Sequence, residues 1–269
     1  MKEEKMVPSY DGTKLRFRKD IVEDPKALIV ISHGLCEHLN RYDYFTEKLN
    51  ENGYSVYRYD QRGHGKSEGK RVFFSHYDEM PDDLDVIVDI AKEESNGKKV
   101  FLFGHSMGGE TAALYGTKNP GKVDAIITSG ALTRYNNPIM GDQFPIAAPP
   151  DTYVPNSLGN GVCSDIKVIE AYVNDPLVEK QISIELINQI YAGVQWLKEH
   201  AENFVEPVLI MHGADDGLIS VKDSLDFFQG IKSADKSLRV YAKLFHEILN
   251  EPCKDEIIAD IVLWLGKHI

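Results

Sequence analysis

The stretch KVFLFGHSMGGETAALYGTK, residues 99–118, decides the fold class of this chain. Its first part, VFLFG, is apolar almost throughout, as expected of a strand that is buried on both faces of a parallel sheet. Its second part, from Met107 onward, has the pattern of a helix. The G-x-S-x-G pattern from Gly104 to Gly108 lies at the junction, where glycines permit a sharp turn and lift Ser106 to the head of the helix. The stretch therefore predicts a strand, a tight turn and a helix that present a serine as a nucleophile.

Short apolar runs alternate with amphipathic stretches along most of the chain. The runs are expected to be strands, at residues 27–33, 54–60, 99–104, 125–130, 207–213 and 238–244. Helical patterns fill the gaps, at about residues 41–51, 80–95, 107–118, 220–230 and 254–268. Asp11-Gly12, between residues 5–10 and 13–21, predicts a two-residue hairpin turn. This order predicts an α/β fold with a mostly parallel, doubly wound sheet that begins with an antiparallel hairpin.

The alternation is interrupted between residues 131 and 205. Residues 136–161 contain five prolines and three glycines, and helical patterns follow in IKVIEAYV, residues 166–173, and in residues 182–200. We expect this segment to be an inserted helical cap over the carboxyl edge of the sheet, where open α/β folds bind ligands. The predicted organisation is a core formed by residues 1–130 and 206–269, with residues 131–205 as the cap.

Composition excludes several other classes of protein. The chain has 42 acidic and 30 basic residues, a net charge of −12, which argues against nucleic acid or an anionic membrane held by a basic face. No apolar run has the length of a transmembrane helix, and no signal peptide follows the charged residues 1–6. The three cysteines are widely spaced, unlike those of a disulfide framework or a zinc site. We expect a cytoplasmic protein without cofactor or metal, touching a membrane or micelle at most transiently through the cap. The oligomeric state is not predicted.

A serine hydroxyl becomes a good nucleophile when a base takes its proton and a carboxylate orients that base. Candidates for both partners follow the last two predicted strands, at the sheet edge where Ser106 is expected. Asp215 and Asp216 come just after residues 207–213, and His246 follows residues 238–244 after Phe245. We expect Ser106 and His246 to be catalytic, with one of the two aspartates as the acid.

The tetrahedral intermediate of such a reaction needs two backbone N–H groups as an oxyanion hole. One is expected from Met107, the residue after the nucleophile. The second is expected from the loop after residues 27–33, which points to the N–H of Leu35.

Four motifs resemble the signatures of monoacylglycerol lipases and related lysophospholipases, α/β-hydrolases of the S33 serine-aminopeptidase type. HGLCEH at residues 33–38, followed by Arg41-Tyr42, is similar to the family's H-G-x-x-E-H-x-x-R-Y. DQRGHGKS at residues 60–67 resembles D-x-R-G-H-G-x-S, GHSMGG is the family's form of the serine turn, and NDPL at residues 174–177 matches a motif near the end of the cap. Together these matches span nearly the whole chain.

The resemblance implies an α/β-hydrolase fold and hydrolysis of carboxylic esters without metal or cofactor. It implies a catalytic triad of Ser106, Asp216 and His246, because H-G-x-x-D is the usual arrangement in this superfamily; Asp215 remains the alternative acid. It further implies that Glu37 and Arg41 approach the glycerol end of the substrate. The alternative is that these two side chains pair only with each other at the i, i+4 spacing.

Two departures from mammalian members bear on the substrate. Leu249 stands where those members have a second histidine, and the first half of the cap, FPIAAPPDTYVP, is broken by prolines instead of forming a long apolar helix. A more soluble, shorter-chain ester is therefore a possible substrate, while the chemistry is unchanged.

The sequence favours a serine hydrolase of lipid-like esters, with monoacylglycerol as the first candidate substrate. A lysophospholipase or a short-chain carboxylesterase would use the same machinery. An α/β-hydrolase that binds a small ligand without catalysis, and an acyltransferase, are the alternatives from other classes.

Overall fold

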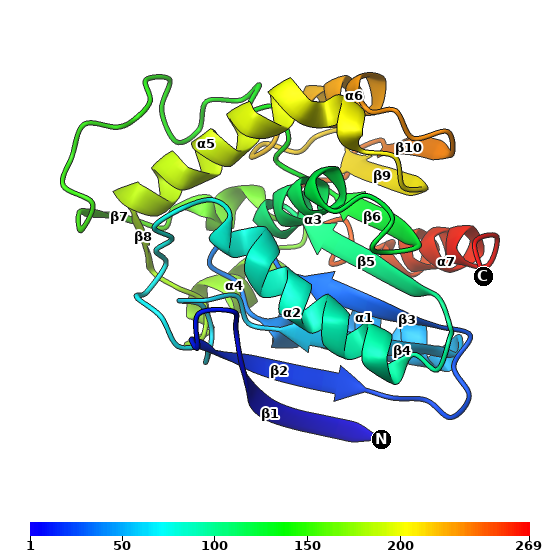
Figure 1. Cartoon of the computed structure of the whole chain (residues 1–269). Helices are drawn as coiled ribbons and strands as arrows, with labels where there is room; N and C mark the ends of the chain where they lie inside the picture. The colour runs from blue at the N-terminus through cyan, green and yellow to red at the C-terminus, as the bar shows by residue number, and fades with distance from the viewer.

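The computed structural model describes residues 1–269, the side chain of Asn160 excepted. Its centre is an eight-stranded sheet in the order β1-β2-β4-β3-β5-β6-β9-β10 (Figure 1). The strands are β1 (Lys2–Pro8), β2 (Lys14–Asp20), β3 (Ala27–Ser32), β4 (Tyr54–Tyr59), β5 (Val100–His105), β6 (Ala125–Ser129), β9 (Val208–Gly213) and β10 (Lys236–Tyr241). β2 pairs antiparallel with β1 and β4, and the remaining neighbours are parallel. This confirms the predicted sheet and its antiparallel entry.

Helices cover both faces of the sheet, as a doubly wound fold requires (Figure 1). The helices are α1 (Asp43–Glu51), α2 (Glu79–Glu94), α3 (Met107–Lys118), α4 (Ile166–Asn174), α5 (Ile184–His200), α6 (Val221–Gly230) and α7 (Lys254–Leu265). α1 and α7 share one apolar core with the sheet, and α2, α3, α5 and α6 contribute to the other. β3, β4, β5 and β6 are buried along their whole length, which explains their nearly uninterrupted apolar sequences.

The predicted two-residue hairpin turn is wrong, because five residues separate the paired ends of β1 and β2. The ladder ends at Pro8 opposite Lys14. A turn follows in which Ser9 N–H donates to the carbonyl of Thr13 at 2.7 Å and Gly12, at φ +91°, donates to the carbonyl of Ser9. A type I′ turn needs a positive φ at both central residues, and Asp11 is not among the residues with positive φ. Its carboxylate instead accepts the N–H of Thr13 at 2.9 Å.

The last strand begins and ends earlier than predicted, at Lys236 and Tyr241. Lys243 has a positive φ of 65°, so the chain cannot continue there as a strand. The chain therefore leaves the sheet three residues sooner and has a longer path to His246.

The segment between β6 and β9 contains α4, α5 and a small two-stranded antiparallel sheet that the sequence did not predict. This sheet pairs β7 (Tyr153–Pro155) with β8 (Gln181–Ser183). Residues 131–152 are irregular, as the prolines indicated, while α4 and α5 agree with the predicted helical stretches. In Figure 1, α5 crosses the molecule beside α3, and the irregular residues loop away from the sheet.

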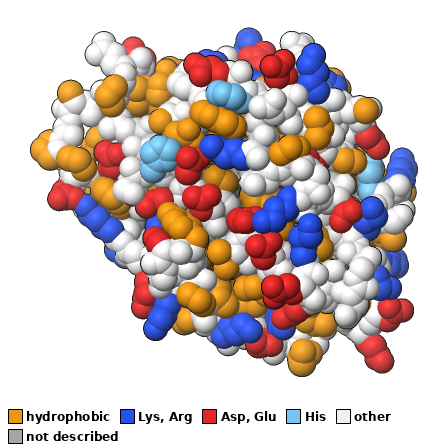
Figure 2. Space-filling model, in the orientation of Figure 1, with side chains coloured by type: hydrophobic (Ala, Val, Ile, Leu, Met, Phe, Trp, Pro, Cys, Tyr) orange, Lys and Arg blue, Asp and Glu red, His pale blue; other side chains and the backbone are white. Residues whose placement is uncertain are grey.

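Charged side chains of both signs are interspersed on the face that carries α2. Figure 2 shows Lys and Arg scattered among Asp and Glu there. In the described chain, every helix is too short or too polar to span a bilayer.

One carboxyl group on α3, that of Glu110, is buried without a hydrogen-bond partner in the described structure. The Glu110 side chain is fully buried, and within the described structure neither of its oxygens has a hydrogen-bond partner. The backbone of Gly193 on α5 approaches so closely that a Cβ there would lie 2.7 Å from Glu110 Oε1. Burial raises the pKa of Glu110 well above its usual value, so the folded protein holds this group neutral.

We expect Glu110→Met to stabilise the protein, and to do so more at higher pH. Above the unfolded pKa, the unfolded chain releases the Glu110 proton that the folded chain retains. Stability therefore falls by about 1.4 kcal/mol per pH unit until the folded pKa is reached. Urea unfolding at about pH 5 and about pH 7 measures this difference. A gain that is equal at both pH values, or equal to that of the exposed Glu93→Met, would contradict a neutral buried Glu110.

Candidate active site

Ser106 occupies a strained turn between β5 and α3. Its backbone has φ 55° and ψ −120°, a conformation that non-glycine residues rarely adopt. Two of the surrounding glycines are required by contact. A Cβ on Gly104 would lie 2.1 Å from the carbonyl oxygen of Gly108, and a Cβ on Gly108 would lie 2.2 Å from that of Ser32. The G-x-S-x-G pattern thus allows α3 to start directly against the sheet, with Ser106 at its head.

His246 lies against Asp216. His246 Nδ1 is 2.7 Å from Asp216 Oδ2, and the other oxygen, Oδ1, accepts the backbone N–H groups of Leu218 and Ile219, each at 2.9 Å. His212 Nε2 lies 3.0 Å from the same Oδ2. Asp216 therefore has four donors around a fully buried carboxylate. Asp215, the alternative acid, is exposed.

The charges of this pair stabilise each other. Burial alone would raise the pKa of Asp216, but the positive charge of His246 and hydrogen bonds from His212 and His246 hold it well below its usual value. Burial alone would lower the pKa of His246, but the negative charges of Asp216 and Glu247 raise it above its usual value. An ionised aspartate beside a basic imidazole is the state that a general base needs.

Ser106 and His246 line one cavity. Leu35, Met107, Glu37 and Glu247 also line it, together with apolar side chains that come mostly from the segment after β6: Leu132, Ile139, Met140, Leu158, Val162, Tyr172, Ile190, Leu218 and Ile219. Within the described side chains, the Ser106 hydroxyl makes no hydrogen bond to His246. Such contacts often form only when substrate is bound.

Two backbone N–H groups at this cavity have no hydrogen-bond acceptor within the described structure. In the described part of the chain, the N–H groups of Leu35 and Met107 donate to no protein acceptor, although both residues are buried. Buried N–H groups nearly always have a partner, so two of them beside Ser106 form a candidate oxyanion hole.

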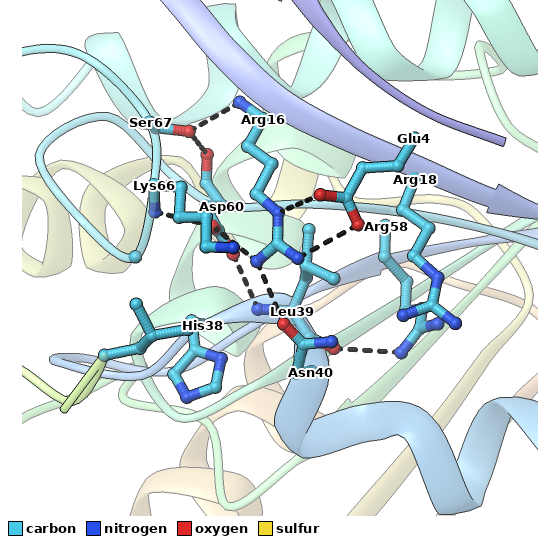
Figure 3. Close-up of polar contacts among 12 residues, drawn as sticks. Glu4, Arg16, Arg18, His38, Leu39, Asn40, Arg58, Asp60, Lys66 and Ser67 are labelled. Atoms are coloured by element: carbon cyan, nitrogen blue, oxygen red, sulfur yellow. Dashed lines mark hydrogen bonds and ion pairs between the residues drawn. The ribbon is translucent and has the colours of Figure 1, made fainter. Parts of the chain in front are cut away.

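The loop that carries Leu35 is fixed by the loop after β4. Gln61 N–H donates to His33 Nε2 at 2.9 Å, and the Gln61 side chain donates to the His33 carbonyl at 2.6 Å. Asp60, fully buried, accepts the N–H of Leu39 at 2.7 Å and that of Lys66 at 2.8 Å. Figure 3 shows the contacts of Asp60 with Leu39 and Lys66, and the Arg16 guanidinium between Asp60 and Glu4. Hydrogen bonds thus join the motifs at residues 33–38 and 60–67 into one unit.

Glu37 and Arg41 occupy different places. Glu37 lines the cavity, whereas Arg41 is absent from its described lining and forms a bidentate pair with Glu247, at 2.5 and 2.8 Å. The i, i+4 contact between Glu37 and Arg41 is also present, but at 3.4 Å it is the weaker one. The Arg41 guanidinium lies 4.8 Å from the ring centroid of Tyr172 on α4.

Three residues near the site were not among the predicted site residues. Glu247 directly follows His246, and His212 ends β9 four residues before Asp216; their positions beside candidate residues are the only signal. Asp223 on α6 is fully buried and accepts the backbone N–H groups of residues 134–136, which fixes the start of the segment after β6. These three partner residues lie nearly ninety residues away in sequence, so no local pattern marks Asp223. Among the described residues, no group of three or more potential metal ligands is gathered.

We expect Gly108→Ala to destabilise the protein by about 3 kcal/mol, because the added methyl group would collide with the carbonyl oxygens of Ser32 and His33. Gly217→Ala is the matched control, since a Cβ there meets nothing within 4 Å. Chemical unfolding of both variants measures the difference. Equal stabilities would show that α3 does not need this close approach.

A family model described as serine aminopeptidase, S33, matches residues 23–253. The monoacylglycerol lipase of Mycolicibacterium smegmatis is 31% identical over 252 residues, which cover 91% of this chain and 90% of that protein. The crystal structure of a monoacylglycerol lipase from Paleococcus ferrophilus, 30% identical, superposes with a TM-score of 0.85 and covers 95% of this chain and 99% of its own. A soluble variant of monoglyceride lipase from Saccharomyces cerevisiae, in complex with a substrate analog, is 25% identical with a TM-score of 0.86, over 99% of this chain and 95% of its own.

These similarities cover nearly the whole chain and confirm both the resemblance found in the motifs and the α/β-hydrolase fold that it implied. They extend through the segment between β6 and β9 as well as the sheet. The chain belongs to the serine aminopeptidase S33 family of α/β-hydrolases.

Proposed function

We propose that this protein hydrolyses carboxylic esters through an acyl-enzyme on Ser106. The observation that carries the proposal is the Asp216–His246 pair, 2.7 Å apart, which shares one cavity with a serine on a strained turn. The two unused N–H groups of Leu35 and Met107 at the same cavity supply the place for an oxyanion.

In this mechanism, His246 takes the proton of Ser106 as the hydroxyl attacks the ester carbonyl. Asp216 holds the imidazole in position and stabilises its positive charge, and His212 in turn orients Asp216. The N–H groups of Leu35 and Met107 bind the oxyanion. His246 then gives its proton to the departing alcohol, and a water molecule releases the acid by the same steps.

Monoacylglycerol is the substrate that we propose. The cavity is lined largely by apolar side chains, suited to an acyl chain, and it has a polar wall at Glu37 beside His246, suited to an alcohol bearing hydroxyl groups. Relatives that match over nine-tenths of the chain are named monoacylglycerol lipases, which supports this choice. We further propose that residues 131–205 act as a cap, because they contribute seven of the lining residues and so determine which acyl chain fits.

We expect Ser106→Ala to lower ester hydrolysis by at least ~10⁴-fold while leaving the fold intact, because the hydroxyl acts only in the chemical step. Fatty-acid release from monoacylglycerols of increasing chain length, and from lysophosphatidylcholine, measures the loss. A fluorophosphonate probe that labels the wild type but not the variant completes the test. A wild type that neither labels nor turns over would instead favour a ligand-binding protein, and ester formation from added alcohol would favour an acyltransferase.

Asp216→Asn is expected to lower kcat by about 10⁴-fold, since an amide stabilises the wrong tautomer of His246. The exposed Asp215→Asn is the matched control and is expected to keep wild-type kcat. Steady-state hydrolysis of one soluble ester compares the two. The reverse order would reassign the acid to Asp215.

A further inference from the structure

Two buried carboxyl groups share one cation beside His246. The side chains of Glu37, Arg41 and Glu247 are 6%, 10% and 3% exposed. Arg41 directs both terminal nitrogens at Glu247, at 2.5 and 2.8 Å, and reaches Glu37 at 3.4 Å with one of them. One guanidinium compensates one buried carboxylate, and a second carboxylate in the same place is strongly disfavoured. The better partner of Arg41 is Glu247, so the group left without a counterion is Glu37.

No other neighbour of Glu37 is a cation with which it can form an ion pair. The titratable and charged groups that face Glu37 come from the following turn, from β5, from the loop after β10 and from α4: Arg41 and Tyr42, His105, His246 and Glu247, and Tyr172. His105 Nε2 is 3.7 Å from Glu37 Oε1, but burial lowers the pKa of His105 to about 3, so this ring is neutral. Burial raises the pKa of Glu37 more than it is lowered by the charge of His246, which is paired with Asp216, and by a hydrogen bond from Tyr42.

We infer that Glu247 is a positioning residue: by holding Arg41 it leaves Glu37 as a neutral carboxylic acid, whose O–H donates to the alcohol portion of the substrate. This inference rests on the proposed ester hydrolysis. Burial raises the pKa of Glu37 to about 7, and the charge of Arg41 outweighs burial to lower the pKa of Glu247, in keeping with this division of charge.

The protonation state of Glu37 decides which alcohol the cavity accepts. An ionised carboxylate at this wall would accept hydrogen bonds only, would attract a cationic head group and would oppose negative charge on the leaving oxygen. A carboxylic acid donates a hydrogen bond and leaves the wall electrically neutral. The geometry therefore suits esters of uncharged polyols over esters with an ammonium group.

Glu37→Gln imitates the neutral form and cannot ionise. With a monoacylglycerol substrate, we expect its kcat/KM to be within about 3-fold of wild type at about pH 6 and at least ~5-fold above wild type at about pH 8.5, where the wild-type carboxyl has lost its proton. In both proteins kcat/KM rises with pH as His246 loses its proton. Only in the wild type does kcat/KM fall again above about pH 7. Glu206→Gln, a buried glutamate that accepts the Gly121 N–H before β9, is the matched control and is expected to keep the wild-type profile. Lower activity of Glu37→Gln at every pH would overturn the inference.

Glu247→Gln releases Arg41 to pair with Glu37, which then ionises. We expect this variant to lose at least ~10-fold in kcat/KM on monoacylglycerol at about pH 6. The double variant Arg41→Gln/Glu247→Gln removes both members of the ion pair and leaves Glu37 without a cation. We expect its kcat/KM on monoacylglycerol at about pH 6 to be within about 3-fold of the wild-type value. A purely structural role for Glu247 predicts no recovery in the double variant, and that result would overturn the inference.

An infrared measurement tests protonation without turnover. The carbonyl band of a protonated Glu37 should be present at about pH 6 in the wild type and in the double variant, and missing in Glu37→Gln and Glu247→Gln. Glu110 contributes the same band to all four proteins, so its band cancels when the spectrum of one protein is subtracted from that of another. A band that is unchanged in Glu37→Gln would overturn the inference even if Glu247→Gln failed to fold.

Hydrolysis of p-nitrophenyl acetate separates this inference from the proposed function. Its leaving group needs no donor, so we expect Glu37→Gln, compared with wild type at about pH 8.5, to raise its hydrolysis less than it raises hydrolysis of monoacylglycerol. A wild type that fails on this ester and on monoacylglycerol overturns the proposed function, while the infrared bands still decide the state of Glu37. A wild type that succeeds on both, with Glu37→Gln impaired on both, overturns only the inference.

Discussion

The contact between the first turn of α3 and the end of β3 is the constraint on which the site depends. Gly108 lies so close to the carbonyl oxygens of Ser32 and His33 that no side chain fits between them. This approach sets the start of α3 against the sheet, and the turn before it takes the strained conformation of Ser106. It also brings the Met107 N–H to the loop that carries Leu35. One close backbone packing thus assembles the nucleophile and both N–H groups of the candidate oxyanion hole.

Hydrogen bonds among the surrounding polar groups fix the loops and side chains of the site. Asp60 and Gln61 fix the loop from His33 to Leu39, and Asp216 is fixed by two backbone N–H groups and His212. Each of these groups is buried, where an unpaired polar atom is costly, so their hydrogen bonds oppose rearrangement. Rigid donors that need no rearrangement during the reaction are what stabilise a developing charge well. The same burial makes the charge state of Glu37 depend on which carboxyl group holds Arg41.

The fold could be predicted from the sequence because its signals are local. Apolar runs marked the buried strands, and glycines marked the turn at Ser106. The failures were local as well: Asp11-Gly12 has the composition of a two-residue turn, but the carboxylate of Asp11 is used inside a longer one. The small sheet of β7 and β8 escaped notice because its strands have three residues each and lie in an irregular region. Candidate catalytic residues were found because each follows a strand at the same edge.

What the sequence by itself determined is the order of strands and helices, the glycine-bounded serine and the family to which the chain belongs. The tertiary structure alone decided which aspartate meets His246, since Asp215 and Asp216 are adjacent in sequence and differ only in the direction that the turn gives their side chains. It alone decided that Arg41 pairs with Glu247, 206 residues away, in preference to Glu37, four residues away. Pairing of buried charges depends on distances across the fold, and a linear pattern does not contain them.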